Sequence, residues 1–240
     1  RYPNYDRDLR QGNYRSRLAR HRDRTGIVAF DAQETLIGQQ VTHDGKTYRV
    51  PYIHPSIVQA TRLASGITDY GTTQQLIEPL EKLFEKYIGV LASTAQLLVL
   101  WVLSTYFPDS VPSPPCLAIS GFDMGLAVRL FLLLKCLVRR GLLLTEINRS
   151  GFCSLVTPLH PTLLINQPGL PLEVRAFFRA SNFPGLVVPG GGGDVGDVSG
   201  SKAVFVGTDV TTDPWSEATI HIALLPTRDA LPLLDARTQN

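Results

Sequence analysis

Five short apolar runs, each flanked by residues with a turn pattern or a helical pattern, constrain the fold of this 240-residue chain more than any other feature. They cover residues 116–119, 142–145, 163–165, 203–206 and 219–225. Continuous apolar runs of this length are typical of strands that are buried on both faces. Segments with a helical sequence pattern between these runs favour crossover connections between parallel strands. We therefore predict an α/β fold with a mostly parallel five-stranded sheet covered by helices.

The sequence before residue 71 predicts a hairpin and a short helix rather than strands of the parallel sheet. Residues 41–50 contain two short strand patterns around an Asp44-Gly45 turn, which predicts a hairpin. A short helix is expected over residues 56–63, with Ser56 as its cap. We therefore predict an arginine-rich arm over residues 1–25, a small α+β region over residues 26–70 and the main domain over residues 71–240.

The arm concentrates positive charge. Residues 1–24 contain eight arginines and three aspartates, a local charge of +5, whereas the remainder has 15 basic and 18 acidic residues. Such an arm can follow the phosphates of a nucleic acid or the acidic face of a protein assembly. A solvated lead-in without a ligand is the alternative interpretation. The candidate contact residues are Arg15, Arg17, Arg20, Arg22 and Arg24.

Two helices are indicated between residues 76 and 108. Apolar residues at helical spacing over residues 76–91 predict an amphipathic helix, with Pro79 expected near its first turn. Residues 87–108 then carry no charge, which is long enough for a membrane span. Polar residues within the run and its continuity with the amphipathic helix favour a buried core helix instead. We therefore expect no membrane contact, and we expect Trp101 to be buried against the helix that follows residues 116–119.

In the rest of the domain, glycines are expected to mark the ends of a strand and of a helix and to form a loop. The run 116–119 ends in Ser120-Gly121, and a leucine-rich helix is expected over residues 126–137. Arg139 and Arg140 would place cations at the end of this helix, and Gly141 would stop it. The glycine-rich residues 189–202 are predicted to form a loop within the domain.

A strand, a glycine loop, a helix and a later strand that ends in two polar residues form the layout of P-loop NTPases. Residues 77–225, roughly 60% of the chain, resemble the P-loop ATPase domain of primase-helicase-type proteins of phages, plasmids and integrated elements. Four pieces of sequence carry the resemblance in order: LWVLSTYFPD at 100–109, PCLAISG at 115–121, the pair Arg139-Arg140 and PTLLINQ at 161–167. It implies a P-loop NTPase-like domain with homo- or hetero-oligomer contacts and a role in mobile-element replication or other nucleic-acid handling.

The phosphate loop that this resemblance implies is degenerate. A working loop reads G-x-x-x-x-G-K-[ST], because backbone amides cradle the phosphates, the lysine neutralises them and the hydroxyl binds magnesium. Here Gly121 and Gly125 are one residue too close, and Leu126 and Ala127 stand in place of the lysine and the hydroxyl. Asp123 would bring negative charge toward a phosphate.

The second motif is degenerate as well. The resemblance places a magnesium-shell carboxylate and a water-orienting carboxylate where Asn166 and Gln167 stand. An amide is a poor magnesium ligand and no base at neutral pH. We therefore expect no catalytic residue, no metal and no cofactor, as in a pseudoenzyme. The alternative is an active ATPase with unorthodox residues, whose lysine would come from Lys135, Lys202 or another subunit. A further alternative is an interaction domain that docks to a larger assembly through its arm.

The spacing of the cysteines and histidines does not indicate a metal site. The three cysteines form no CxxC pair, and the five histidines stand in no ligand pattern, so a zinc site is not expected. Free thiols favour a reducing compartment, and we expect a cytoplasmic protein. The chain begins at Arg1 rather than Met without a basic-then-apolar leader, which leads us to expect a processed or excised piece.

Overall fold

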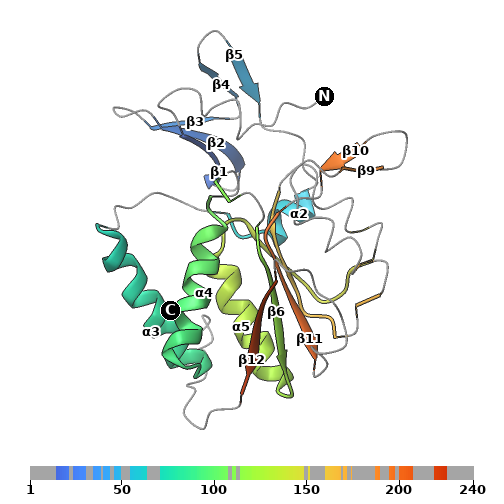
Figure 1. Cartoon of the computed structure of the whole chain (residues 1–240). Coiled ribbons are helices and arrows are strands. Elements are labelled where there is room, and N and C mark those ends of the chain that lie inside the picture. Colours follow the sequence, from blue (N-terminus) through green and yellow to red (C-terminus); the bar gives the residue numbers. More distant parts are fainter. Residues whose placement is uncertain are drawn as a thin grey trace, which may run out of the picture. The chain divides into compact units, whose positions relative to one another are not determined.

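The structure, a computed structural model, divides the chain into two compact units, Arg1–Thr68 and Asp69–Asn240 (Figure 1). The described residues are 15–21, 24–30, 35–38, 40–43, 46–49, 55–63, 71–107, 110–111, 114–148, 151, 160–168, 170–171, 174, 187–189, 195–197, 200–207 and 219–225.

The first unit contains two small antiparallel sheets and a short helix. β1 (Arg15–His21), β2 (Arg24–Phe30) and β3 (Thr35–Gly38) form one sheet in that order. β4 (Gln40–His43) and β5 (Lys46–Arg49) form the hairpin expected around residues 44–45, and His43 pairs with Lys46. Helix α2 (Pro55–Ala60) is shorter than the predicted helix over 56–63. The boundary expected between residues 25 and 26 falls within β2, so residues 15–21 and 24–25 of the arm belong to regular strands.

The second unit is built on a five-stranded parallel sheet, which confirms the predicted α/β fold. Its strands are β6 (Cys116–Gly121), β7 (Gly141–Leu144), β8 (Thr162–Ile165), β11 (Lys202–Gly207) and β12 (Thr219–Leu224). Their spatial order is β12-β6-β11-β8-β7, and every pairing is parallel. β6, the first strand of this sheet in chain order, therefore lies inside the sheet between the last two, β11 and β12.

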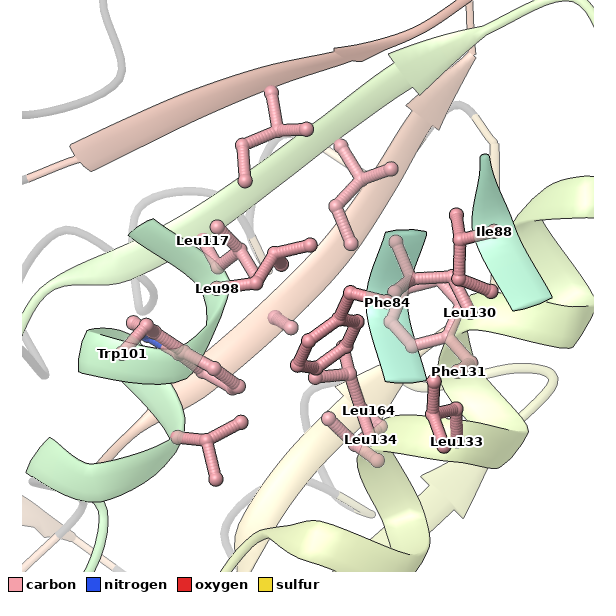
Figure 2. Close-up of a cluster of buried hydrophobic side chains, with 14 of the residues drawn as sticks. Phe84, Ile88, Leu98, Trp101, Leu117, Leu130, Phe131, Leu133, Leu134 and Leu164 are labelled. Carbon is pink, nitrogen blue, oxygen red and sulfur yellow. The ribbon is translucent and has the colours of Figure 1, made fainter. Parts of the chain in front are cut away.

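Both faces of this sheet contribute to buried apolar clusters, as expected for continuous apolar strands, although the edge strand β12 exposes His221 and Ala223. Leu117, Ile119 and Phe205 belong to a cluster that includes the helices α3 (Thr73–Ile88), α4 (Ala92–Ser104) and α5 (Met124–Leu137). These three helices lie together on one face of the sheet (Figure 1). Figure 2 shows their side chains converging with Leu117 and Leu164 of the sheet. On the opposite face, a second cluster joins Cys116, Leu142, Leu163, Ile165 and Val204 to Ile147, Leu170 and Val174.

Helix α3 begins earlier than the sequence predicts. Thr72 and Gln75 form a reciprocal capping box, in which Thr72 Oγ1 accepts from the Gln75 amide at 3.2 Å and the Thr72 amide donates to Gln75 Oε1 at 2.8 Å. The expectation that Pro79 lies near the first turn is therefore wrong, because it lies in the second turn on the exposed side. Gly89 ends the helix in the left-handed conformation, where glycine has no side chain to clash.

Helix α4 is buried on one face. Trp101 is 1% exposed, as predicted, and its Nε1 donates to the carbonyl oxygen of Pro115 at 2.9 Å. Leu97 and Leu100 are exposed, so the expectation of a helix enclosed on all sides is wrong for this outer face. The helix has 13 residues, about 20 Å of length, against the 30 Å or so of a bilayer core. Within the described part of the chain, no helix is long and apolar enough to cross a membrane.

The turn from α5 to β7 does not use Gly141 as a helix stop. Arg140 adopts the left-handed conformation, with φ of 52°, and Gly141 is the first residue of β7. A Cβ at Gly141 would lie 2.7 Å from the carbonyl oxygen of Lys135, so the glycine allows the strand to pass close to the helix. The Tyr106 hydroxyl donates to the Leu137 carbonyl at 2.8 Å, which satisfies a group at the helix end.

Part of the glycine-rich segment has regular structure. β9 (Val187–Pro189) and β10 (Val195–Asp197) pair antiparallel in a separate two-stranded sheet. The prediction of a loop throughout residues 189–202 is therefore wrong at its two described strand segments and at Lys202, which begins β11.

Candidate functional site

The candidate site lies at the carboxyl edge of the parallel sheet, where β6 and β8 end. Gly121 ends β6, and Asn166 and Gln167 follow β8, so the fold brings the two segments that the resemblance singles out to the same edge. β11 pairs with both strands and separates them by two strand spacings, roughly 10 Å. This edge of a parallel sheet is where α/β folds bind ligands, and we refer to it below as the carboxyl edge.

Gly121 has a packing role there. A Cβ on this residue would lie 2.9 Å from the Leu224 carbonyl oxygen and 3.1 Å from Leu224 Cβ. β12 pairs Leu224 with Gly121, so the neighbouring strand excludes any side chain at this position. A Cβ at Gly125 would be near only the Asp123 carboxylate, at 3.2 Å. The first glycine is therefore explained by sheet packing, without a phosphate.

Asp123 occupies the N-terminus of α5. It is the N-cap residue, and its Oδ1 accepts a hydrogen bond from the backbone N–H of Leu126 at 2.9 Å. A helix N-terminus favours an anion because its first amides lack partners and its dipole is positive there. In this protein the anion is the chain's own carboxylate.

The two residues that the resemblance compares with the lysine and the hydroxyl of a phosphate loop face the core. Leu126 is 4% exposed and Ala127 is fully buried, and both belong to the cluster between the helices and the sheet. Met124, one turn earlier along the helix, and Phe122 in the preceding loop are exposed instead. The residues that follow the second glycine therefore stabilise the fold, and the loop presents apolar side chains and one carboxylate.

Asn166 provides an acceptor without a donor. Its backbone N–H donates to the Leu144 carbonyl at 2.9 Å, which joins the end of β8 to the end of β7. Its Oδ1 is buried and accepts no hydrogen bond from any residue in the described ranges. A carboxylate at this position would be a buried charge that needs a cation, whereas the amide keeps the shape and removes that requirement.

Gln167 holds the chain that follows β7. Its Oε1 accepts from the backbone N–H of Ile147 at 2.8 Å, and Ile147 is buried in the second core cluster. The side-chain amide of Gln167 thus makes a structural hydrogen bond across 20 residues of sequence.

Lys135 and Lys202 lie at the opposite, amino edge of the sheet. Lys202 is the first residue of β11, pairs with Cys116 and is 1% exposed, and its Nζ donates to the Gly200 carbonyl at 2.6 Å. Lys135 is in the last turn of α5, with its backbone against Gly141, the first residue of β7. A six-residue strand is roughly 17 Å long, so neither lysine reaches the carboxyl edge within one chain.

Burial at this amino edge also affects a cysteine. Desolvation raises the pKa of the Cys116 thiol from 9.0 to about 11, and the charge of Lys202 opposes part of that rise. The protonated thiol is a core group rather than a nucleophile.

The candidate arginines lie in the first unit. Arg15, Arg17 and Arg20 are in β1 and Arg24 is in β2, whereas Arg22 lies outside the described residues. Among the residues that the structure describes, no group of three metal-ligating side chains from His, Cys, Asp and Glu occurs.

Sequence reasoning missed two structural roles at the carboxyl edge. An aspartate directly before a helical pattern is a capping signal, so the role of Asp123 could have been found from local sequence. The role of Gln167 could not, because its partner Ile147 is distant in sequence and only the strand order brings them together.

A scan against protein-family models and searches of curated proteins and of solved structures find no match to this chain. The interpretation of the site therefore depends on its own geometry and chemistry.

Proposed function

We propose that the second unit is a catalytically degenerate P-loop ATPase-like domain that acts as a structural or regulatory module of a nucleic-acid-handling assembly, such as one for mobile-element replication. The observation that carries this proposal is the Asp123 cap. The Asp123 carboxylate accepts a hydrogen bond from the Leu126 backbone N–H at the helix end where a phosphate would bind. The parallel sheet, with a glycine-ended strand leading into a helix, supports the scaffold.

Charge and burial both disfavour a bound triphosphate. A phosphate at the N-terminus of α5 would compete with Asp123 for the same amide and would be repelled by its negative charge. Leu126 and Ala127 cannot replace a lysine and a hydroxyl, because their side chains are apolar and packed in the core. The loop therefore does not fit a magnesium nucleotide.

The side chains of the second motif, Asn166 and Gln167, also do not fit a magnesium nucleotide. Asn166 offers a neutral oxygen, which is a weak ligand for magnesium, and Gln167 Oε1 is already an acceptor for Ile147. Neither residue can remove a proton from water at neutral pH. A structural or regulatory relative of an ATPase would retain the α/β fold and lack the catalytic groups.

The test is nucleotide binding and turnover by the full chain. Calorimetry with ATP, with and without magnesium, should give no binding heat, and a phosphate-release assay should give no turnover. Robust turnover by the native chain would overturn the proposal and favour an active ATPase with a lysine from another subunit, since Lys135 and Lys202 are at the amino edge.

A matched pair of variants separates the capping role of Asp123 from its charge. Asp123→Ser keeps a good N-cap and removes the negative charge, whereas Asp123→Ala removes both. We expect Asp123→Ser to retain stability and Asp123→Ala to lose about 1 kcal/mol. The double variant Asn166→Asp/Gln167→Glu should remain inactive, because neither new carboxylate holds the triphosphate on which both would act.

We also propose a cytoplasmic location. Cys116 and Cys136 are free thiols, the state expected in a reducing compartment. Detection of the protein by cell fractionation in a periplasmic or secreted fraction would contradict this part of the proposal.

A further inference from the structure

The register of the β1–β2 pair sorts the arginines of the first unit onto two faces. Residues that alternate along a strand lie on one face, and residues directly opposite in an antiparallel pair share that face. His21 pairs with Arg24 and Arg15 pairs with Phe30, so both pairs lie on the face that also holds Arg17. We call Arg15, Arg17, His21 and Arg24 the arginine face; Val28, Phe30 and Ile37 occupy the same side of the sheet.

The other face has a different composition. It holds one arginine, Arg20, which pairs with Thr25. The remaining positions are mostly apolar or small, namely Ser16, Leu18, Ile27, Ala29, Leu36 and Gly38. Three of the four arginines in β1 and β2 thus share a face with a histidine and a phenylalanine.

We propose that the arginine face binds single-stranded nucleic acid. Its setting in a nucleic-acid-handling protein rests on the function proposed above, but all the residues of this face belong to the β1–β2–β3 sheet (Figure 1). Charge complementarity selects the partner, because residues 1–24 carry a local charge of +5 and a nucleic acid has a charge at every phosphate. Arg15 and Arg17 are two residues apart on β1, roughly 7 Å along the strand, so they can contact different points of one backbone.

The residue types favour nucleic acid over an acidic protein. The basic residues of 1–24 are all arginines, whose planar guanidinium groups bind phosphate in a bidentate manner and stack on bases. Phe30, directly opposite Arg15 in the register, adds an aromatic residue to this face. Unpaired bases stack on such aromatic residues, whereas a duplex presents only base edges in its grooves. A single strand therefore fits this face better than a duplex.

The experiment measures binding of the full chain to a fluorescein-labelled 20-residue oligothymidylate by fluorescence anisotropy at several salt concentrations. The parallel probes are the same oligonucleotide paired with oligodeoxyadenylate, a 20-residue oligouridylate and polyglutamate. We expect the single strands to bind more tightly than the duplex and polyglutamate. Oligouridylate and oligothymidylate distinguish RNA from DNA, and either one supports the proposal.

Two single variants with the same change in charge test the face. Arg17→Gln lies on the arginine face and Arg20→Gln on the opposite face. We expect Arg17→Gln to lower the magnitude of the salt slope by about 0.7, the value for one phosphate contact with a single strand, and Arg20→Gln to leave it unchanged. The triple variant Arg15→Gln/Arg17→Gln/Arg24→Gln should lower it by about 2.

Native protein provides a second test that does not depend on how the variants fold. Photo-crosslinking to an oligonucleotide that contains 4-thiothymidine, followed by peptide mapping, should place adducts within residues 15–30. Equal effects of Arg17→Gln and Arg20→Gln, tighter binding to the duplex, binding to polyglutamate alone, or adducts confined to residues 69–240 would each overturn the proposal. Phosphate release measured on the same preparation bears only on the degenerate ATPase, so the two failures are distinguishable.

Discussion

The hydrogen bond between Gln167 and Ile147 yields a prediction that separates a structural role from a catalytic one. Gln167→Leu preserves much of the side-chain volume but removes the oxygen that accepts from the Ile147 amide at 2.8 Å. Ile147 is 4% exposed, so its N–H would be left without a partner away from water. An unsatisfied buried donor costs about 1–3 kcal/mol, and the free energy of unfolding should fall by that amount. Gln167→Glu keeps an acceptor oxygen and should lose less.

The assay is urea denaturation followed by tryptophan fluorescence. Trp101 and Trp215 both belong to the unit Asp69–Asn240, so the signal reports that unit. With a denaturant slope of about 2 kcal/mol per molar, a loss of 2 kcal/mol lowers the urea midpoint by about 1 M. Gln96→Leu is the matched control, because Gln96 is exposed on α4 and the same substitution there should change stability by less than about 0.5 kcal/mol. Equal midpoints for Gln167→Leu and Gln96→Leu would refute the structural role of this hydrogen bond.

Three further predictions concern the packing of the second unit. Trp101→Ala should lower the free energy of unfolding by about 3–5 kcal/mol, because it leaves a cavity and removes the indole donor of the Pro115 carbonyl. Leu100→Ala, on the exposed face, should lower it by less than about 1 kcal/mol in the same denaturation assay. Gly141→Ala should cost about 1–3 kcal/mol by forcing α5 away from β7, and an unchanged thermal midpoint would contradict the close approach. The Cys116 thiol has a pKa near 9.0 when unfolded and about 11 when folded, so stability is intact below pH 9 and should decline as the pH rises from 9 to 11; Cys116→Ala should show a smaller decline over that range.

The elements of the second unit were largely predictable from local pattern. Strands that are buried on both faces must be apolar throughout, so runs such as residues 163–165 and 203–206 coincide closely with β8 and β11. Errors arose where a local signal had two meanings. Gly141 follows a helix and suggested a stop, but the close approach of a strand to the Lys135 backbone is what requires glycine there.

The polar residues of the candidate site were identified by sequence but their roles were not. Asp123 was expected to repel a phosphate, and the structure shows that it also caps α5 through the Leu126 amide. Whether Gln167 is free or committed depends on Ile147, which reaches it only because β7 and β8 are neighbours. The arginines are a similar case, since their composition was evident but their division between two faces depends on the β1–β2 register.

The sequence by itself determined which chemical groups the carboxyl edge could contain. If the proposed P-loop resemblance holds, Leu126 and Ala127 stand where a working loop needs a lysine and a hydroxyl, and amides at 166 and 167 stand where the second motif needs carboxylates. Only the tertiary structure decided whether other groups could replace them, and it places Lys135 and Lys202 at the opposite edge of the sheet. The physical reason is that residue identity belongs to each position of the chain, whereas proximity depends on which strands pair and in which order.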